Sequence, residues 1–532
     1  MGRLTTSSAP ARPPIAILGV PFDNLTKREA LEQIEQMVAS RQPHYLVTPN
    51  VDFLVQARKD IELRRILFEA HLVLCDGTPL VWASRLLGNP LPERVAGADI
   101  VPLLIEVAQK RCYRLFLLGA TPDACSCAVI RLMKKHPELL IAGHYSPDFH
   151  PLLEMDHEEI KRRILEAKPD VLLVSFGCPK QEKWIAMHYR SLGVPVIAGV
   201  GATIDFLAGQ VKRAPVWMGR MGLEWVFRLV QEPRRLFRRY LTDLWVFGGS
   251  ILLQWWQLKL RAYGRRSYGA LRAEGLAGGT GAKDPSAREP DWQHIRLPER
   301  LDFAAVSGGE IELDKLVDVN RHCVLDIRGV TFIDSTGVGF LIRLQKTIRA
   351  AGCELVLLNP SANVQRALAL MRLQDFFLCA RNIESAQEII AAGSGEESTG
   401  VTRRSDASQT VLAWHGEITA TNAEAIWQRT REHLAMLSSK EAATIDLAAV
   451  RFMDSTGLGL MVRIRKLSSQ NKQAVHFINF QPAVRNVLHL ARLEEFLLNS
   501  GESVASQTAV SLSEPNAHLD ESAHTTQPAT AH

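Results

Sequence analysis

One stretch of this chain occurs twice, at a fixed offset of 120 positions. The sequence VLDIRGVTFIDSTGVGFLIRLQKTIRAAG, from Val324, matches TIDLAAVRFMDSTGLGLMVRIRKLSSQNK, from Thr444, and the register continues as far as RLQDFF and RLEEFL. Such self-similarity means that the second half of the chain holds two copies of one domain. Because 532 residues exceed what one hydrophobic core organises, the first half must form a further domain.

The composition is that of packed globular protein, since 46% of the residues are hydrophobic and 22% are charged. The net charge of +5 is too small to indicate a nucleic-acid partner. None of the eight cysteines belongs to a C-x-x-C pair, and most lie in apolar runs. We therefore expect a reducing compartment, without disulfides and without a zinc site.

Two segments bear on the relation of the chain to a membrane. Residues 1–14 lack the apolar run of an export signal. The longest apolar stretch, Leu244 to Leu258, contains Gln254 and Gln257 and is shorter than the roughly twenty residues that span a bilayer. We expect a cytoplasmic protein that lies peripherally on the inner face of the cell membrane.

Short β-rich runs alternate with helical patterns between Pro14 and Val200. The runs are HYLVTPN, HLVLCDG, YRLFLLGA, DVLLVSFG and VPVIAGVG. Strands separated by helices predict an α/β fold with a Rossmann-like, doubly wound parallel sheet. Ligands bind such sheets at the carboxyl ends of the strands. The residues at those ends are Thr48, Asn50, Asp76, Gly119, Gly177 and Gly201.

Five motifs in this half resemble the WecG/TagA/CpsF family of glycosyltransferases. They are TPNVDFLVQARKDIELRRILFEAHLVLCDGTPLVWASRLLGNPLPERVAGADIVPLL, FLLGATPD, SFGCPKQEKW, GVGATIDFLAGQVKRAPVW and GLEWVFRLVQEPRRLFRRYL, in the family's order. The resemblance implies a UDP-sugar donor, often of N-acetylmannosamine or a related hexose. It also implies an undecaprenyl-diphosphate-linked acceptor, in the assembly of cell-surface polysaccharide.

Asp76 is our candidate for the general base. Glycosyl transfer with inversion requires a group that takes the proton of the acceptor hydroxyl while UDP leaves, and a carboxylate at a strand end suits that role. Spacing alone leaves open that Asp76 caps the next helix, but the resemblance implies the catalytic role. Thr48 and Asn50 end the preceding strand, where they either bind hydroxyl groups of a substrate or form the turn before a helix.

Arg94, in PERVAG, offers a cation for the departing diphosphate, unless it is an exposed arginine at a helix start. No D-x-D motif stands at a strand end, so we expect catalysis without a metal or other cofactor. Glycine turns at Gly119 and Gly177 precede helices and suit phosphate binding by backbone amides, although such turns occur in every sheet of this kind. The resemblance implies nucleotide or acceptor contacts for Gln181 and Asp205.

Residues 212–266 mix aromatic and basic side chains at helical spacing, with twelve Lys or Arg against three acidic residues. Such a segment suits the surface of a membrane with anionic headgroups, and the alternative is a docked helix with a solvated arginine face. The family resemblance implies that this appendage brings arginines over the active site. The arginines concerned are Arg228, Arg235, Arg238 and Arg239.

Both repeats resemble the STAS domain of anti-sigma factor antagonists, in which the serine of a D-S-x-G turn can be phosphorylated. Ser335 and Ser455 occupy that position, at the start of an expected helix. A phosphate there would meet free amide donors next to an aspartate. The alternative is that both serines merely cap helices and that the two domains are constitutive binding modules, in either case separable from catalysis.

We expect seven segments along the chain, followed from the N-terminal side. They are a UDP-sugar glycosyltransferase domain (14–210), the basic aromatic appendage (211–264), a linker (265–291), the first STAS domain (292–392), a second linker (393–408), the second STAS domain (409–505) and a disordered tail (506–532). The favoured function is an inverting hexosyltransferase with regulatory or docking domains that bind a protein partner or kinase. The alternative is a catalytically inactive signalling scaffold.

Overall fold

The computed structural model describes most of the chain. The described residues are 12–210, 215, 218, 224–231, 233–263, 292–307, 317–394, 400–406, 409–419, 422–436, 442–471, 474–482, 484–485, 488 and 497. The expected linker 265–291, most of the linker 393–408 and the expected tail lie outside them. The chain divides into two compact units, one of residues 1–400, 416–425 and 453–459 and one of residues 401–415, 426–452 and 460–532.

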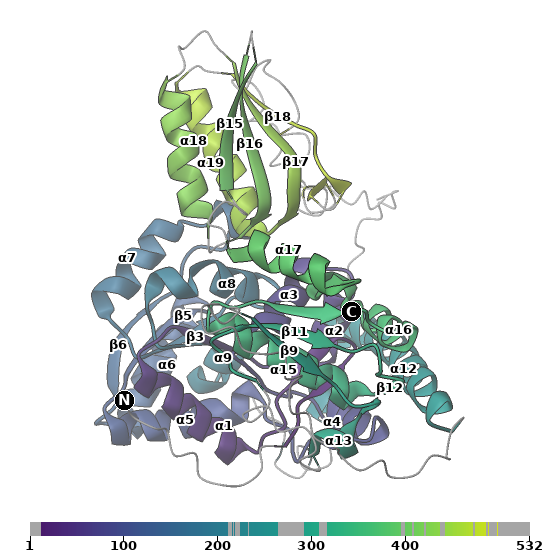
Figure 1. Cartoon of the computed structure of the whole chain (residues 1–532). Coiled ribbons are helices and arrows are strands. Elements are labelled where there is room, and N and C mark those ends of the chain that lie inside the picture. The colour runs from purple at the N-terminus through teal and green to yellow at the C-terminus, as the bar shows by residue number, and fades with distance from the viewer. Residues whose placement is uncertain are drawn as a thin grey trace, which may run out of the picture. The chain divides into compact units, whose positions relative to one another are not determined.

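A six-stranded parallel sheet organises the first half of the chain (Figure 1). Its strand order is β4-β3-β8-β7-β5-β6, and every neighbouring pair is parallel. The strands are β3 (His44–Val47), β4 (Leu72–Val73), β5 (Arg114–Gly119), β6 (Leu140–Tyr145), β7 (Val171–Ser175) and β8 (Val196–Gly199). The α/β fold expected from the sequence is confirmed.

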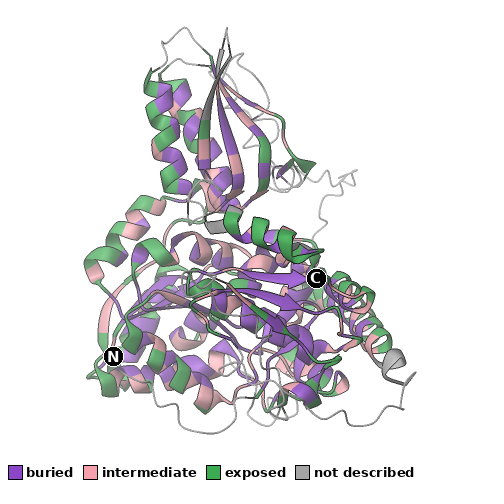
Figure 2. Ribbon diagram, in the orientation of Figure 1, coloured by how far each residue is buried: buried purple, intermediate pink, exposed green. Residues whose placement is uncertain are grey.

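Helices cover both faces of this sheet, because successive side chains of each strand point to opposite faces. They are α1 (Lys27–Ser40), α2 (Val51–Ala57), α3 (Ile61–Glu69), α4 (Thr78–Leu86), α5 (Gly97–Arg111), α6 (Pro122–Lys135), α7 (His157–Ala167), α8 (Lys180–Leu192) and α9 (Thr203–Ala208). Leu115 and Leu117 of β5 pack with α1, α5, α6 and α9. Phe116 and Leu118 join a second core with α2, α3, α4, α7 and α8. The strands are accordingly buried along most of their length (Figure 2).

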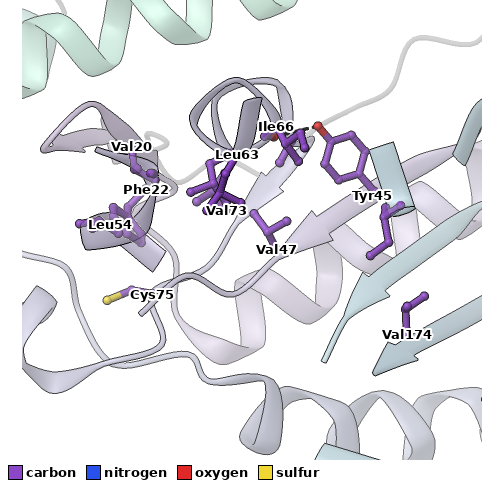
Figure 3. Close-up of a cluster of buried hydrophobic side chains, with 14 of the residues drawn as sticks. Val20, Phe22, Tyr45, Val47, Leu54, Leu63, Ile66, Val73, Cys75 and Val174 are labelled. Atoms are coloured by element: carbon purple, nitrogen blue, oxygen red, sulfur yellow. Dashed lines mark hydrogen bonds between the residues drawn. The ribbon is translucent and has the colours of Figure 1, made fainter. Parts of the chain in front are cut away.

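The second core is closed by side chains from α2, α3 and a short hairpin, β1 (Ile15–Ile17) and β2 (Val20–Phe22) (Figure 3). Tyr45 lies in this core, and its hydroxyl donates a 2.8 Å hydrogen bond to the carbonyl oxygen of Ile66. The bond satisfies a phenol that would otherwise be buried without a partner.

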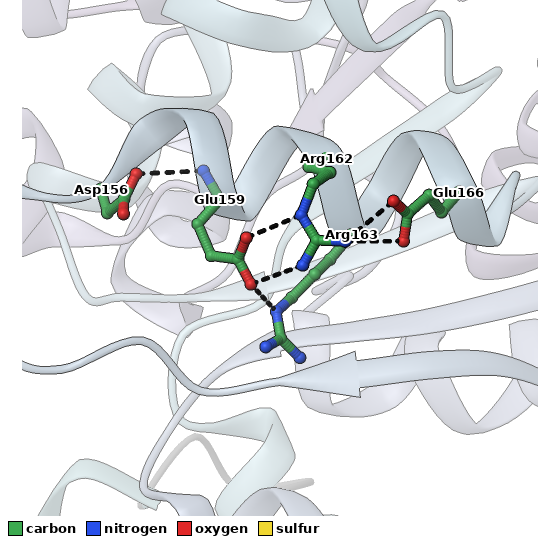
Figure 4. A network of polar contacts seen from close by, with 5 residues as sticks. All are labelled: Asp156, Glu159, Arg162, Arg163 and Glu166. Carbon is green, nitrogen blue, oxygen red and sulfur yellow. Dashed lines mark hydrogen bonds and ion pairs between the residues drawn. The ribbon is translucent and has the colours of Figure 1, made fainter.

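The hairpin and β6 were not predicted from the sequence. In β6 every residue is exposed or half-buried, so the strand has no apolar alternation to reveal it. It is an edge strand beside α7, whose outer surface carries an ion-pair network of Glu159, Arg162, Arg163 and Glu166 (Figure 4). Exposed pairs of this kind contribute little to stability.

The basic appendage forms two helices, α11 (Glu224–Gln231) and α12 (Pro233–Tyr263). Phe247 and Ile251 of α12 belong to the second core of the sheet. Among the described helices, none is both long enough and apolar enough to cross a membrane.

The first repeat folds around a four-stranded parallel sheet of order β14-β13-β11-β9. Its elements are β9 (Trp292–Arg296), β10 (Arg300–Leu301), α13 (Phe303–Ser307), β11 (His322–Asp326), β12 (Phe332–Ile333), α15 (Ser335–Ala350), β13 (Leu355–Leu358), α16 (Ala362–Leu370), β14 (Leu378–Ala380) and α17 (Ile383–Ser394). Ala16 and Phe68 of the first domain belong to the core of this repeat. The two domains therefore share a hydrophobic core, which the separable module expected from the sequence would not have.

The second repeat has a four-stranded sheet of order β15-β16-β17-β18. Its elements are β15 (Gly400–Asp406), β16 (Gln409–Ile418), α18 (Ala423–Met436), β17 (Ala443–Met453), α19 (Ser455–Gln470) and β18 (Val475–Ile478). Asp454 caps α19 through the amides of Thr456 and Gly457, as Asp334 caps α15 in the first repeat.

Gly119 is required at the end of β5. It has a φ of +97°, and a Cβ at this position would lie 2.4 Å from the carbonyl oxygen of Ser175. We expect Gly119→Ala to destabilise the protein by about 3 kcal/mol, through the left-handed backbone and the clash together. Gly88 has a similar φ of +90° but open space around it, so Gly88→Ala should cost only about 1 kcal/mol. Urea unfolding of both variants measures the difference, and equal midpoints would contradict it.

Candidate active site

The candidate residues lie at the carboxyl edge of the six-stranded sheet. Thr48 and Asn50 follow β3, Asp76 follows β4, and Gly177 follows β7. Gly119 ends β5. Because all six strands are parallel, these positions come to one edge.

Backbone hydrogen bonds join the ends of β3 and β4 to the segment that carries Arg94. The amide of Asp76 donates to the carbonyl oxygen of Pro49 at 3.0 Å, and the amide of Val95 donates to that of Cys75 at 2.8 Å. Gly97 lies against the hydroxyl groups of Thr48 and Thr203, since a Cβ there would come within 3.4 and 3.5 Å of them. The edge thus presents two hydroxyl groups and the half-buried carboxylate of Asp76 in neighbouring loops.

Asn50 has a local role that the sequence left open. Its Oδ1 accepts a 3.3 Å hydrogen bond from the amide of Phe53 and thereby caps α2. Asp76, in contrast, is separated from α4 by Gly77, which is the residue that precedes this helix without a side-chain cap. The geometry therefore leaves the Asp76 carboxylate outside a helix-capping role.

Arg94 lies between two carboxylates. Its guanidinium binds Asp99 at 2.8 Å and both oxygens of Glu224, the first residue of α11. These hydrogen bonds and the nearby Asp76 raise the pKa of Arg94, against the effect of its burial. Arg94 is thus a fixed cation close to Asp76, as expected, but in this structure its hydrogen bonds go to protein carboxylates.

Gln181 is almost fully buried and braces the loop after β8. Its Oε1 accepts a hydrogen bond from the amide of Gly201 at 3.0 Å, and its Nε2 donates to Glu182 at 2.6 Å. Burial raises the pKa of Glu182 to about 7. Gln181 therefore positions a site loop in this structure, and its expected substrate contact stays a prediction.

Asp205 lies in the first turn of α9, where burial raises its pKa. Arg239 is exposed and reaches the active edge through a 2.8 Å ion pair with Asp52 of α2. Arg238 is exposed on the same helix. Arg228 and Arg235 lie in α11 and α12, but their side chains are outside the described part of the structure.

Comparison with known proteins assigns both halves of the chain. The model of the glycosyl transferase WecG/TagA/CpsF family matches residues 15–261. Two Staphylococcus aureus proteins, from strains MW2 and NCTC 8325 / PS 47, are 31% identical over 226 residues, which cover 42% of this chain and 87% of theirs. The chain belongs to the WecG/TagA/CpsF family. It is accordingly a glycosyltransferase.

Both relatives bear the name N-acetylglucosaminyldiphosphoundecaprenol N-acetyl-beta-D-mannosaminyltransferase. The STAS domain model matches residues 288–386, and a second STAS model, described as Mlab, matches residues 401–499. The chain is thus a WecG/TagA/CpsF transferase followed by two STAS domains, as expected from the repeat.

Ser335 and Ser455 begin α15 and α19, the positions expected for the STAS serines. Both are buried, Ser335 completely. Their phosphorylation stays a prediction, and for Ser335 it requires a movement that exposes the hydroxyl.

Sequence reasoning missed the acidic partners of this family's basic residues. Glu224 and Asp52 pair with Arg94 and Arg239, and Asp243 lies close enough to Asp52 and Arg239 for their charges to shift its pKa, which burial raises to about 6. Glu224 and Asp243 are two of only three acidic residues in the basic segment 212–266, and that rarity was the available signal.

The pairing of Arg94 gives a testable prediction for nucleotide affinity. A diphosphate must compete with Glu224 for the guanidinium, so Glu224→Gln should tighten UDP binding roughly two- to fivefold, the range of a partly exposed ion pair. Calorimetric titration with UDP measures this change. Glu93→Gln, on an exposed carboxylate that pairs with Lys27, is the matched control and should leave the affinity unchanged. Weaker binding by Glu224→Gln would instead show that Glu224 positions Arg94.

Proposed function

We propose that this chain transfers a hexosyl group, N-acetylmannosaminyl or a related sugar, from a UDP-sugar to an undecaprenyl-diphosphate-linked acceptor in cell-surface polysaccharide assembly. The observation that supports it most is the carboxylate of Asp76, which lies at the carboxyl edge of the sheet beside the fixed cation Arg94. The names of the relatives agree with this acceptor and this sugar.

In the proposed reaction, the acceptor hydroxyl oxygen attacks the anomeric carbon while the bond from that carbon to the UDP oxygen breaks. The hydroxyl proton passes to Asp76, and the negative charge that develops on the diphosphate is stabilised by Arg94. The configuration at the anomeric carbon inverts, because this is a single displacement. We propose that Arg94 takes the place of a divalent metal ion in this step.

We further propose that α12 lies on the inner face of the membrane and brings the active edge to the lipid-linked acceptor. One face of this helix carries large apolar side chains that are 47–75% exposed. They are Phe237, Leu241, Leu244, Trp245, Leu252 and Trp256. The exposed Arg238 and Arg239 lie on the same helix. An exposed apolar stripe with nearby arginines suits the boundary between anionic headgroups and acyl chains.

The assignment of Asp76 is tested by Asp76→Asn. This variant should lose at least about a hundredfold in kcat, because a general base contributes to the barrier, while UDP binding stays close to that of the wild type. The assay is UDP release from a panel of UDP-sugars with a short-chain prenyl-diphosphate-sugar, with and without excess chelator. Wild-type turnover of the variant would refute the assignment, and a strict need for added divalent metal would refute the role of Arg94.

Membrane binding is tested at the tip of the apolar stripe. Replacing both Leu244 and Trp245 with Ala should weaken sedimentation with vesicles of anionic lipid by at least about tenfold, because two large apolar side chains are lost from the contact. Gln257→Ala, at an exposed polar position of the same helix, serves as the control. Equal binding by all three proteins would place the membrane contact elsewhere.

A further inference from the structure

Ser335 of the first STAS domain touches the helix that we propose to lie on the membrane. Its side chain is 0% exposed, and its Oγ accepts a 2.9 Å hydrogen bond from Nε2 of Gln254 in α12. The position at which a STAS domain offers its serine is thus occupied by this chain's own transferase domain.

Gln254 connects three elements through one side chain that is 0% exposed. Besides Ser335 of α15, its Nε2 donates to the carbonyl oxygen of Ala16 in β1 at 3.0 Å. Its Oε1 accepts a 3.0 Å hydrogen bond from the amide of Leu18, directly after β1. Both donors of the amide are therefore used, and α12, α15 and the β1 hairpin are held at one point.

The surroundings of this point are closely packed. A Cβ on Gly339, one turn along α15, would lie 2.6 Å from the carbonyl oxygen of Pro14. Farther along the helix, Lys346 donates a 2.7 Å hydrogen bond to the carbonyl oxygen of Ala70. Phe68 of α3 packs against Phe376, with ring centroids 5.0 Å apart. Polar and apolar contacts thus extend along the whole of α15.

The same α12 reaches the active edge of the sheet. Four turns before Gln254, Arg239 pairs with Asp52 in the first turn of α2. Between these two points Phe247 and Ile251 are buried in the core of the sheet. A displacement of α12 at Gln254 would therefore be carried along a continuous helix to the edge where Thr48 and Asn50 lie.

From these contacts we propose that the first STAS domain is an intramolecular clamp on α12, with Ser335 as its release point. Gln254 is a positioning residue that holds α12 through the clamp. A negative charge on Ser335, or a partner that engages this serine, must displace Gln254 and so loosen α12 and β1.

Physical chemistry makes Ser335 an effective release point. A charge placed here would be buried beside the carboxyl group of Asp334, which burial already disfavours in its ionised form, with a pKa raised to about 6. An uncompensated buried charge is costly, so separation of the two surfaces that exposes it to water becomes favourable. The shared core explains why the domain otherwise stays docked.

Hydrogen–deuterium exchange of the full chain tests the clamp without any assay of activity. In Ser335→Asp, peptides that cover residues 15–22 and 250–258 should exchange at least about tenfold faster than in the wild type, because buried hydrogen bonds are lost. Gly339→Ala should act in the same direction by pressing on Pro14, without adding a charge. Thr347→Asp, which places the same charge on an exposed position of α15, should leave both peptides unchanged.

Unchanged exchange in both Ser335→Asp and Gly339→Ala would overturn the clamp. Protection of β5 and β7 reports whether the transferase sheet remains folded. Where a variant loses that protection, Gln254→Ala replaces it as the mildest change, and wild-type exchange at residues 15–22 in this variant would likewise overturn the proposal.

The link to catalysis rests on the proposed function and is measured separately, as UDP release. Ser335→Asp should lower kcat about fivefold or more at unchanged protection of β5 and β7, whereas Thr347→Asp should not. Faster exchange with wild-type turnover would refute the coupling to the active edge. Should the wild type release no UDP from any donor, the proposed function fails, and exchange alone still decides the clamp.

Discussion

Backbone hydrogen bonding between parallel strands determines where everything else in the first half can lie. A parallel sheet must be covered on both faces, and here the alternating side chains of β5 enter two different cores. Every strand then delivers its last residue to the same edge. Asp76, Thr48 and the loop at Gly201 come together there although they are far apart in the sequence, and the short bonds from Asp76 to Pro49 and from Gln181 to Gly201 hold these loops in position.

The charges at this edge are arranged as alternating partners. Arg94 lies between Asp99 and Glu224, and Arg239 lies between Asp52 and the more distant Asp243. Each arginine is thus kept in place by carboxylates that an incoming diphosphate can replace, because phosphate oxygens accept the same planar donor groups. The cations are preorganised, and part of the binding free energy is spent in displacing their protein partners.

The sequence was sufficient for those features that depend on local patterns. Five of the six strands, the duplicated STAS domain and the position of Asp76 at a strand end all follow from runs of apolar residues and from the turns that end them. Strand β6 could not be predicted, because an edge strand with half-exposed residues has no alternation. The pairing of Arg94 with Glu224 joins residues 130 positions apart, and the contact of Gln254 with Ser335 joins two domains. Such contacts depend on tertiary packing, for which a single sequence contains no periodic signal.

Helix α12 has two opposite faces with different contacts. Phe247, Ile251 and Gln254 face the protein, whereas Leu244, Trp245 and Trp256 face outward. Each residue of an α-helix is rotated by about 100° from the one before it, so insertion or deletion of a single residue within α12 would turn its far end by that angle and move Gln254 out of register with Arg239. The length of α12 between these two residues is therefore as constrained as their identity, and the helix can vary in length only beyond Gln254.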